Sequence, residues 1–219
     1  MLTYICLLLL DNNWSQPDDQ LFKLLPPKRK LRIEQLYFDS DKLLSLYSVL
    51  LLSYMLENFY NINDALQSIV WEKNKKPTLN ESYDIDFSYS HTNRAVLCGI
   101  TNNNSIGVDI EALNSPPYEI MPLVFHPNEI HYINNSFLSP KHAFYKIWTQ
   151  KEAFTKKIGT GLSDNIVSID TQTPLSVYFN TWIQEQYICS ICLDRQVSSS
   201  QIKYIDLSVS QLRDYFLNK

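Results

Sequence analysis

The sequence predicts an α+β fold built from two similar lobes. Its segments follow one another in the order strand, helices, strands in the first half of the 219 residues, and a similar order recurs in the second half. Apolar residues make up 45% of the chain and charged residues 19%, which excludes a disordered chain. We therefore expect an N-terminal lobe over residues 1–105 and a C-terminal lobe over residues 106–219, each with a small antiparallel sheet packed against helices.

The first half contains a predicted opening strand and a predicted core helix. The apolar run Tyr4–Leu10 lacks the basic flank and the small-residue cleavage site of a signal peptide, so it predicts a buried strand. The stretch Leu43–Leu56 is too short to cross a bilayer and is broken by serines, which favours a core helix. The other expected elements are helices at Lys28–Tyr37 and Asp41–Tyr60, the second capped by Ser40 or Asp41, and strands at Asp86–Ser90 and Arg94–Thr101 around the turn His91-Thr92-Asn93.

The second half opens with a strand that has two different faces. From Ile106 to Glu111, apolar residues alternate with glycine and acids, which is the period of a strand with one buried face. The expected helices are Pro127–Asn134, with proline at its first position, and Pro140–Ile158, which carries an apolar stripe. Further strands are expected at Ile166–Asp170, Ser176–Asn180, Tyr187–Cys192 and Ile202–Leu207.

Composition excludes several classes of function. Nineteen basic and 23 acidic residues give a formal charge of −4, which argues against bulk nucleic-acid binding. The four glycines cannot form a dinucleotide-binding or Walker loop. Thirteen of the 19 basic residues fall in three windows, Lys23–Arg32, Lys73–Lys76 and Lys141–Lys157. These windows are either solvated helix faces or groups that bind a phosphate-bearing small molecule from several directions.

The four cysteines indicate neither a disulfide framework nor a zinc site. Cys189 and Cys192 form a C-x-x-C, but no second pair or nearby histidine completes a metal site. They fall in a predicted strand, so we expect them to be core residues of a cytoplasmic protein.

Two acidic residues on the strand Ile106–Glu111 are candidate ligands for a hard cation. Asp109 and Glu111 are two positions apart, which places both carboxylates on one strand face about 6.5–7 Å apart along it. Such a pair suits a cation that takes oxygen ligands and completes its shell with water and phosphate. A solvated sheet face explains many pairs of this kind, so this pair gains weight only from its neighbours.

The helix Pro140–Ile158 supplies a third acid and a lysine. Glu152 and Lys156 are four residues apart on one helix face, as are Trp148 and Glu152. Taken alone, Glu152 and Lys156 are an ordinary helix ion pair. Gly159 ends the helix, and Gly161 allows a second unusual backbone conformation directly after it.

Together these segments resemble the signature of the 4′-phosphopantetheinyl transferases, in particular the larger, two-lobed Sfp-type. The two main motifs are Gly107-Val108-Asp109-Ile110-Glu111 and Trp148-Thr149-x-Lys151-Glu152-Ala153-x-x-Lys156-x-x-Gly159-x-Gly161-Leu162. Three further segments are similar to the family, namely Lys76-Pro77, Phe87-Ser88-Tyr89-Ser90-His91-Thr92 and Phe125-His126-Pro127-Asn128-Glu129. The resemblance covers roughly residues 25–165 and implies an active site at the interface of the two lobes.

The resemblance implies that the phosphopantetheine arm of coenzyme A moves to a serine hydroxyl of an apo acyl or peptidyl carrier protein, with release of adenosine 3′,5′-bisphosphate. Carriers of this kind serve fatty-acid, polyketide or nonribosomal peptide synthesis. Asp109, Glu111 and Glu152 are then expected to hold Mg²⁺, with Mn²⁺ as a substitute. Glu152, or a metal-bound water, is the candidate base, and Lys156 stabilises or protonates the leaving phosphate.

The resemblance also assigns coenzyme A contacts. The expected cofactor-binding residues are Lys28, Lys76, Pro77, Ser90, His91, Asp109 and Lys156. The family's arginine and glycine on the second helix are replaced by Leu44 and Ser48, and the glycine before Lys-Pro is replaced by Lys75. These departures leave 3′-phosphate binding to His91 and to Lys28, Lys30 or Arg32.

Two other functions fit some of the same residues. The lost arginine and glycine favour a weakened relative that binds coenzyme A or a carrier protein without transfer. Acidic pairs near a lysine also occur in metal-dependent nucleases, but the acidic balance of the chain argues against that class. We expect a cytoplasmic monomer with no nucleic-acid or membrane partner.

Overall fold

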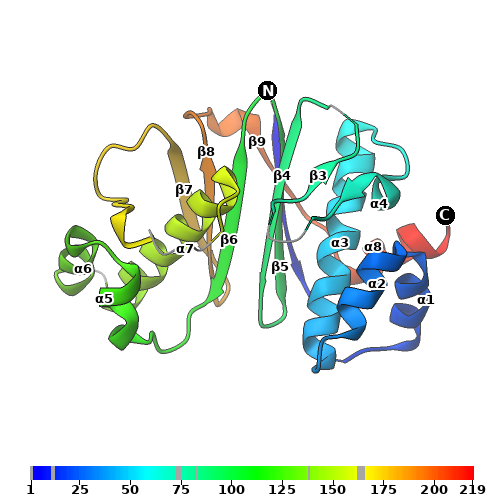
Figure 1. Ribbon diagram of the computed structural model, residues 1–219, viewed down its shortest axis with the longest axis horizontal. Coiled ribbons are helices and arrows are strands. Elements are labelled where there is room, and N and C mark those ends of the chain that lie inside the picture. Colours follow the sequence, from blue (N-terminus) through cyan, green and yellow to red (C-terminus); the bar gives the residue numbers. More distant parts are fainter. Residues whose placement is uncertain (1, 11–12, 73–74, 82, 138, 162–165) are drawn as a thin grey trace.

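Two sheets lie face to face in the middle of the molecule, with helices on both outer sides (Figure 1). The computed structural model describes residues 2–10, 13–72, 75–81, 83–137, 139–161 and 166–219. Leu162, the last residue of the second motif, lies outside the described residues. The arrangement confirms the predicted α+β class.

The first sheet has the strand order β4-β5-β1-β9. Its strands are β1 (Thr3–Leu9), β4 (Ile85–Thr92), β5 (Ala95–Asn102) and β9 (Ile202–Ile205). The β4–β5 and β1–β5 pairs are antiparallel, as expected, whereas β9 runs parallel to β1, with Ile202 opposite Thr3. Residues from both ends of the chain therefore share this sheet.

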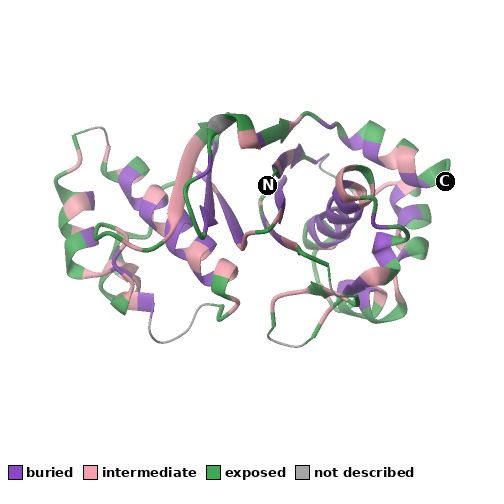
Figure 2. Ribbon diagram, turned by 90° about the horizontal axis from the view of Figure 1, so that it is seen from above, coloured by how far each residue is buried: buried purple, intermediate pink, exposed green. Residues whose placement is uncertain are grey.

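The outer face of the first sheet is covered by α3 (Asp39–Tyr60). This helix is long and apolar enough to cross a membrane by length and composition, but most of it is buried inside the protein, as Figure 2 shows. Its role is that of the core helix expected from Leu43–Leu56. Around it lie α1 (Gln16–Leu24), α2 (Pro27–Glu34), α4 (Ala65–Ser68), the short strands β2 (Ile69–Val70) and β3 (Thr78–Leu79), and α8 (Val209–Leu217).

The second sheet has the order β6-β8-β7 and is antiparallel throughout. Its strands are β6 (Ile106–Ala112), β7 (Tyr178–Gln184) and β8 (Tyr187–Leu193). The long helix α7 (Pro140–Ile158) packs across β6 and β8, and beyond it lie the 3-10 turn Tyr118–Ile120, α5 (Met121–Val124) and α6 (Pro127–Asn134). Both α6 and α7 begin and end where the sequence predicts, because proline opens each helix and Gly159 ends α7 in the left-handed region, with φ +76°.

The inner faces of the two sheets form a shared apolar core. Ile5 and Leu97 of the first sheet pack with Val108, Ile110 and Ile191 of the second. Figure 2 shows this buried layer between the two halves. The apolar face of β6 is therefore committed to the inter-sheet core, which leaves Gly107, Asp109 and Glu111 on the opposite face, toward α7.

Beyond shifted bounds and the unpredicted elements α1, α4, α5, α8, β2 and β3, the structure differs from the predictions in four places. The expected strand Ile166–Asp170 contains the 3-10 turn Ile166–Ser168, because the carbonyl of Ile169 accepts a hydrogen bond from the Lys151 ammonium instead of pairing with a strand. His91 and Thr92 belong to β4, and the turn falls at Asn93-Arg94, where Asn93 has φ 46°. The N-cap of α3 is Phe38, so neither Ser40 nor Asp41 caps it.

The fourth difference concerns the lobes. We assigned residues 106–219 to the C-terminal lobe, yet β9 joins the first sheet, and α8 packs on α1 and α3. Arg213 of α8 contacts both oxygens of the buried Asp18, at 3.1 and 3.2 Å, and donates to the Tyr47 hydroxyl. The last helix is therefore fastened to the first half of the chain, and the division at residue 105 otherwise stays a prediction.

The cysteines lie in the core, as predicted. Cys6, Cys98, Cys189 and Cys192 are all buried and free. Burial raises the pKa of Cys189 and of Cys192 to about 12, so neither thiol is a ready metal ligand.

Candidate active site

The site begins with a close approach between β6 and α7. A Cβ atom placed on Gly107 would lie 1.8 Å from the carbonyl oxygen of Ala153 and 2.5 Å from the amide nitrogen of Lys157. Only glycine leaves room for the helix backbone here. This contact brings Glu152 and Lys156 of α7 next to Asp109 and Glu111 of β6, which confirms that the two motifs lie together.

Asp109 is the buried centre of this cluster. Its Oδ1 accepts hydrogen bonds from the Lys156 ammonium at 2.6 Å and from the Ser90 hydroxyl at 2.7 Å. Lys156 also donates to the Ser90 hydroxyl at 2.7 Å. Ser90 thus joins β4 to the strand and helix that carry the acids, and the structure brings all three predicted residues together.

Glu111 is held in place by two donors. Its Oε1 accepts from the indole nitrogen of Trp148 at 3.1 Å, and its Oε2 accepts from the Thr92 hydroxyl at 3.4 Å. Burial, with a contribution from the negative charge of Asp109, raises the pKa of Glu111. Trp148 and Thr92 therefore orient the Glu111 carboxylate, whose negative charge is destabilised by burial and by the nearby Asp109.

Glu152 completes the acidic cluster from α7. Burial raises its pKa to about 7, the nearby Asp109 and Glu111 carboxylates add to that shift, and Lys156 opposes it. A carboxylate with this pKa changes its protonation state near neutral pH. It can therefore accept a proton from a substrate or ionise fully when a cation arrives.

The donor set of this cluster fits a hard divalent cation. Asp109 Oδ2 is buried without a hydrogen-bond partner, although buried carboxylate oxygens are usually satisfied. Among the described residues, no three His, Cys, Asp or Glu side chains already form a ready-made metal cluster. A bound cation would give the unpartnered Asp109 oxygen a ligand and would stabilise the ionised forms of Glu111 and Glu152, whose pKa values are raised. This arrangement agrees with the predicted role of the three acids as cation ligands.

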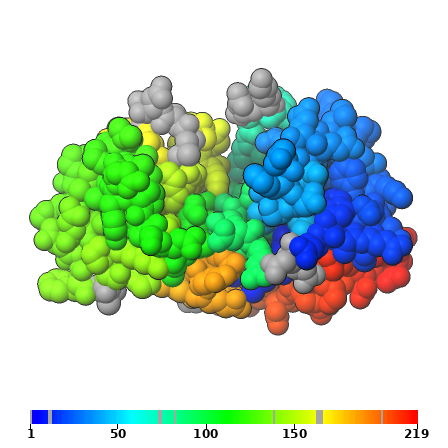
Figure 3. Space-filling model, turned by 90° about the horizontal axis from the view of Figure 1, so that it is seen from below, coloured from blue at the N-terminus to red at the C-terminus, as the bar shows by residue number. Residues whose placement is uncertain are grey.

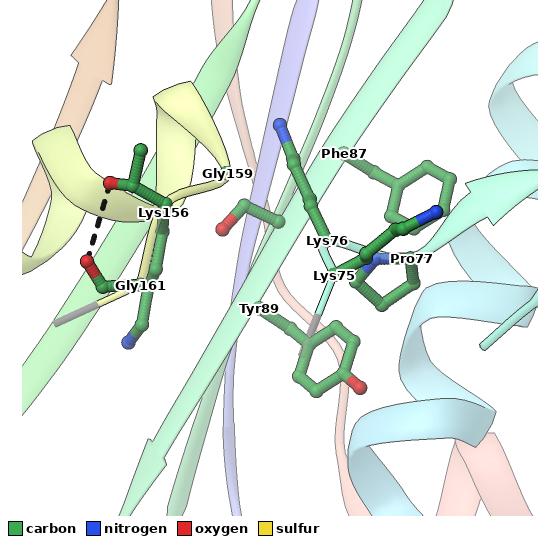
Figure 4. A pocket seen from close by; sticks show the side chains of 10 residues that line it. Lys75, Lys76, Pro77, Phe87, Tyr89, Lys156, Gly159 and Gly161 are labelled. Atoms are coloured by element: carbon green, nitrogen blue, oxygen red, sulfur yellow. Dashed lines mark hydrogen bonds between the residues drawn. The ribbon is translucent and has the colours of Figure 1, made fainter. Parts of the chain in front are cut away.

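A pocket of about 440 Å³ opens beside the acidic cluster, and Lys156 lines it. One wall is the segment Lys75-Lys76-Pro77 together with Phe87, Ser88 and Tyr89 of β4, and the other is Gly159-Thr160-Gly161 after α7. Figure 4 shows Lys156 and Gly161 on one side of this space and Lys76, Pro77 and Tyr89 on the other. The surface is also hollowed between the two halves of the molecule (Figure 3). The pocket and the acids thus share Lys156.

Lys76 lies in the pocket wall, but its ammonium group forms hydrogen bonds with other protein groups. Its ammonium donates to Asp86 Oδ2 at 2.5 Å and to the Ile106 carbonyl at 2.8 Å. Burial lowers the pKa of Lys76, and Asp86 opposes that shift. Pro77 follows it in the same wall, so both residues line the pocket, with the Lys76 nitrogen turned to β6, and their contact with coenzyme A stays a prediction.

His91 is the last predicted contact on β4, and it lies among cations. Its side chain retains access to solvent, while surrounding protein atoms and then the charges of Lys156 and Arg29 lower its pKa. Lys28 is exposed on α2, and its role stays a prediction. The basic residue of α2 that lies inward is Arg29, which donates to the Ser45 hydroxyl at 2.9 Å and stacks over Trp71 at 5.6 Å.

Lys151 of the second motif is a structural residue. Its ammonium is fully buried and donates to Glu129 Oε2 at 2.6 Å and to the Ile169 carbonyl at 2.6 Å. Glu129 in turn accepts from the Thr171 amide and hydroxyl, both at 2.9 Å. This network fixes the middle of α7 from behind, so that the next residue, Glu152, faces β6.

Four residues of the site were not predicted from the sequence: Asp86, Tyr89, Thr92 and Arg29. For Asp86 and Thr92 a signal existed, because polar residues alternate along Asp86-Phe87-Ser88-Tyr89-Ser90-His91-Thr92. That period of two predicts a polar strand face, and this face of β4 contacts β6 through Asp86, Ser88, Ser90 and Thr92. Nothing in the basic run singled out Arg29.

Comparisons with known proteins agree with this site. The model of the 4′-phosphopantetheinyl transferase superfamily matches residues 105–205. The 4′-phosphopantetheinyl transferase gsp of Aneurinibacillus migulanus is 29% identical over 172 residues, covering 72% of this chain and 71% of that protein. The 4′-phosphopantetheinyl transferase Sfp of Bacillus subtilis (strain 168) is 25% identical over 159 residues, covering 70% and 69%.

A eukaryotic relative shows similar coverage. The L-aminoadipate-semialdehyde dehydrogenase-phosphopantetheinyl transferase of Schizosaccharomyces pombe is 28% identical over 185 residues, covering 74% of this chain and 71% of that protein. The family match spans β6, α7 and β8, the elements that bring the three acids and Lys156 together. Over about 70% of its length the chain is therefore similar to 4′-phosphopantetheinyl transferases, and the superfamily model matches the part of the chain that carries the three acids and Lys156.

Proposed function

We propose that this protein transfers the 4′-phosphopantetheine arm of coenzyme A to a serine hydroxyl of an apo acyl or peptidyl carrier protein and releases adenosine 3′,5′-bisphosphate. The observation that carries the proposal is the position of Lys156, which lines the pocket and donates to Asp109. A substrate with an adenosine in the pocket and a pyrophosphate at the acids would span these two features.

Each part of the site is suited to bind one part of coenzyme A. Pro77 and Tyr89 offer apolar and aromatic surface to the adenine, beside the backbone of Gly159-Thr160-Gly161. His91 and Arg29 provide positive or donor groups for the 3′-phosphate. Asp109, Glu111 and Glu152 would hold Mg²⁺, which when bound neutralises charge on the pyrophosphate under attack.

The residues of the chain then divide the transfer between them. Glu152, as a carboxylate of the acidic cluster, accepts the proton of the serine hydroxyl. The serine oxygen forms a bond to the phosphorus that carries the pantetheine arm, and the bond from that phosphorus to the bridging oxygen breaks. Lys156 places a positive charge where the leaving phosphate gains negative charge. The Ser90 hydroxyl accepts a hydrogen bond from the Lys156 ammonium and donates one to Asp109. It therefore holds the ammonium next to Asp109, at the side of the pocket.

The direct test is a transfer assay with a panel of apo carrier proteins, coenzyme A and MgCl₂. We expect the mass of at least one carrier to increase by one phosphopantetheine group, and EDTA to abolish the increase. Glu152→Gln is expected to abolish transfer while the protein stays folded. Calorimetry that shows coenzyme A binding without transfer to any carrier would instead identify a non-catalytic binder.

A further inference from the structure

The carboxylate of Asp86 connects the nucleotide pocket to the strand of the acids. β6 is an edge strand of its sheet, so one side of its backbone is not paired with the backbone of another strand. Asp86 Oδ2 accepts the amide of Ile106 at 2.8 Å, and Lys76 donates to the carbonyl of the same residue at 2.8 Å. The Asp86–Lys76 pair therefore satisfies both backbone groups of the first residue of β6.

The same pair fixes one wall of the pocket. Lys76 Nζ lies 2.5 Å from Asp86 Oδ2, and the two side chains are 17% and 27% exposed. A Cβ built on Gly159 would lie 3.6 Å from the Lys76 Cβ, so the base of the Lys76 side chain lies beside the turn that ends α7. Figure 4 shows the Lys76 nitrogen pointing in a different direction from that of Lys156. Lys76 is thus anchored at its tip, while its neighbours form the wall.

We propose that Asp86 is a positioning residue for phosphopantetheinyl transfer: it holds Lys76 on Ile106 and so sets the Lys75–Pro77 wall relative to Asp109 and Glu111. The inference rests on the proposed function. Lys76 acts on the cofactor through the wall that it anchors, and its ammonium is not a phosphate ligand. Free enzyme already holds the wall in its binding position, so coenzyme A need not order it.

The alternative is that Lys76 leaves Asp86 to bind a phosphate of coenzyme A. Asp86 would then compete with the cofactor for the ammonium. The two arrangements predict opposite effects of removing the Asp86 charge. Loss of a positioning residue weakens cofactor binding, whereas loss of a competitor strengthens it.

The variant Asp86→Asn separates them, because the amide oxygen can still accept from the Ile106 amide while the ion pair with Lys76 is lost. We expect the KM for coenzyme A to rise about tenfold, with kcat changed less than about twofold. Lys76→Met is expected to show the same KM, and the double variant to be no worse than either single variant, since both changes break one interaction. Asp84→Asn, an exposed aspartate just before β4, is the matched control and should leave KM unchanged.

Three outcomes would overturn the proposal. A KM that falls in Asp86→Asn and rises in Lys76→Met would show that Lys76 binds phosphate. A fall in kcat together with a lower unfolding temperature would show a merely structural role, and additive single effects would show that the residues act separately. If the wild-type protein transfers to no carrier, the proposed function fails, and calorimetric titration of the same variants with coenzyme A still tests Asp86.

Discussion

Lys156 of α7 and Asp109 of β6 form an ion pair of 2.6 Å at the boundary between the pocket and the acidic cluster. Asp109 is 3% exposed at its side chain and Lys156 is 30% exposed, so the carboxylate is fixed while the ammonium still reaches solvent. The pair keeps a positive charge beside three acids before any substrate binds. Lys156 can therefore meet a phosphate without a large rearrangement of the site.

Replacement of Lys156 should impair chemistry more than folding. In Lys156→Met, Asp109 keeps its hydrogen bond from Ser90, so we expect only a small loss of stability. We expect kcat to fall about a hundred- to a thousandfold, as for other groups that stabilise charge in a transition state. Steady-state transfer kinetics and thermal unfolding measure the two effects. Lys146→Met on the same helix, where Lys146 contacts Tyr132, is the control. Equal losses of kcat and of stability would point to a structural role.

The pKa of Glu152 predicts how stability depends on pH. Its folded value of about 7 lies above the ordinary value of 4.5, so the unfolded chain releases this proton first as pH rises. The wild-type protein therefore loses stability between about pH 4.5 and 7, and the loss persists above pH 7. Glu152→Gln removes it and should be more stable than wild type by about 1–2 kcal/mol at pH 8, with no difference at pH 4. Urea unfolding at both pH values measures this. A variant less stable than wild type at pH 8 would contradict the assignment.

Magnesium should stabilise the folded protein without any substrate. The unpartnered Asp109 oxygen and the raised pKa values of Glu111 and Glu152 become favourable when a cation binds. At a hundred times its dissociation constant, Mg²⁺ should add about 2.7 kcal/mol to the free energy of unfolding. Thermal unfolding with MgCl₂ and with EDTA measures the shift. Asp109→Asn should abolish the shift, whereas the same shift in that variant would place the ion elsewhere.

Gly107 should tolerate no side chain. A methyl group at this position meets the backbone of α7, which cannot move as a flexible side chain would. We expect Gly107→Ala to lower the free energy of unfolding by more than about 3 kcal/mol, above the usual cost of overpacking. In Gly161→Ala, where no atom of the described residues lies within 4 Å of the added Cβ and φ is +64°, the expected cost is about 1–2 kcal/mol. Equal stability of the two variants in urea would show that β6 and α7 are further apart.

The four cysteines should be unreactive in the folded protein. Burial raises the pKa of Cys6, Cys189 and Cys192 to about 12, and it raises the pKa of Cys98 well above the ordinary value of a thiol. We expect iodoacetamide at pH 8 to label none of them in the native state and all four in urea, as counted by mass spectrometry. Rapid labelling of Cys189 and Cys192 in the native protein would contradict their position in the core.

The sequence predicts the parts of the site whose pattern is local. The alternation in Ile106–Glu111 places Asp109 and Glu111 on one face, and helical spacing places Glu152 beside Lys156, because both periods follow from backbone geometry. The contact between β6 and α7 is not local. It depends on the absence of a side chain at Gly107, which the sequence shows only as a glycine.

Other features depend on interactions between distant residues. Arg29 lies inward because Ser45 and Trp71 are there to receive it, and a run of basic residues contains no sign of that choice. The sequence of Ile166–Asp170 is typical of a strand, but the carbonyl of Ile169 accepts a hydrogen bond from Lys151, which is paired with the buried Glu129. The parallel pairing of β9 with β1 likewise joins residues that are about 200 positions apart, and the next helix, α8, contacts the first half of the chain through Arg213 and Asp18.

The pairing of Thr3 with Ile202 affects the order in which the chain can fold during synthesis. All three strands of the second sheet are available once Leu193 has left the ribosome, whereas the first sheet receives its fourth strand only when Ile202–Ile205 follow. The earliest residues to be made therefore belong to the sheet that is completed last, and the half of the molecule that carries the acids can form its own sheet before then.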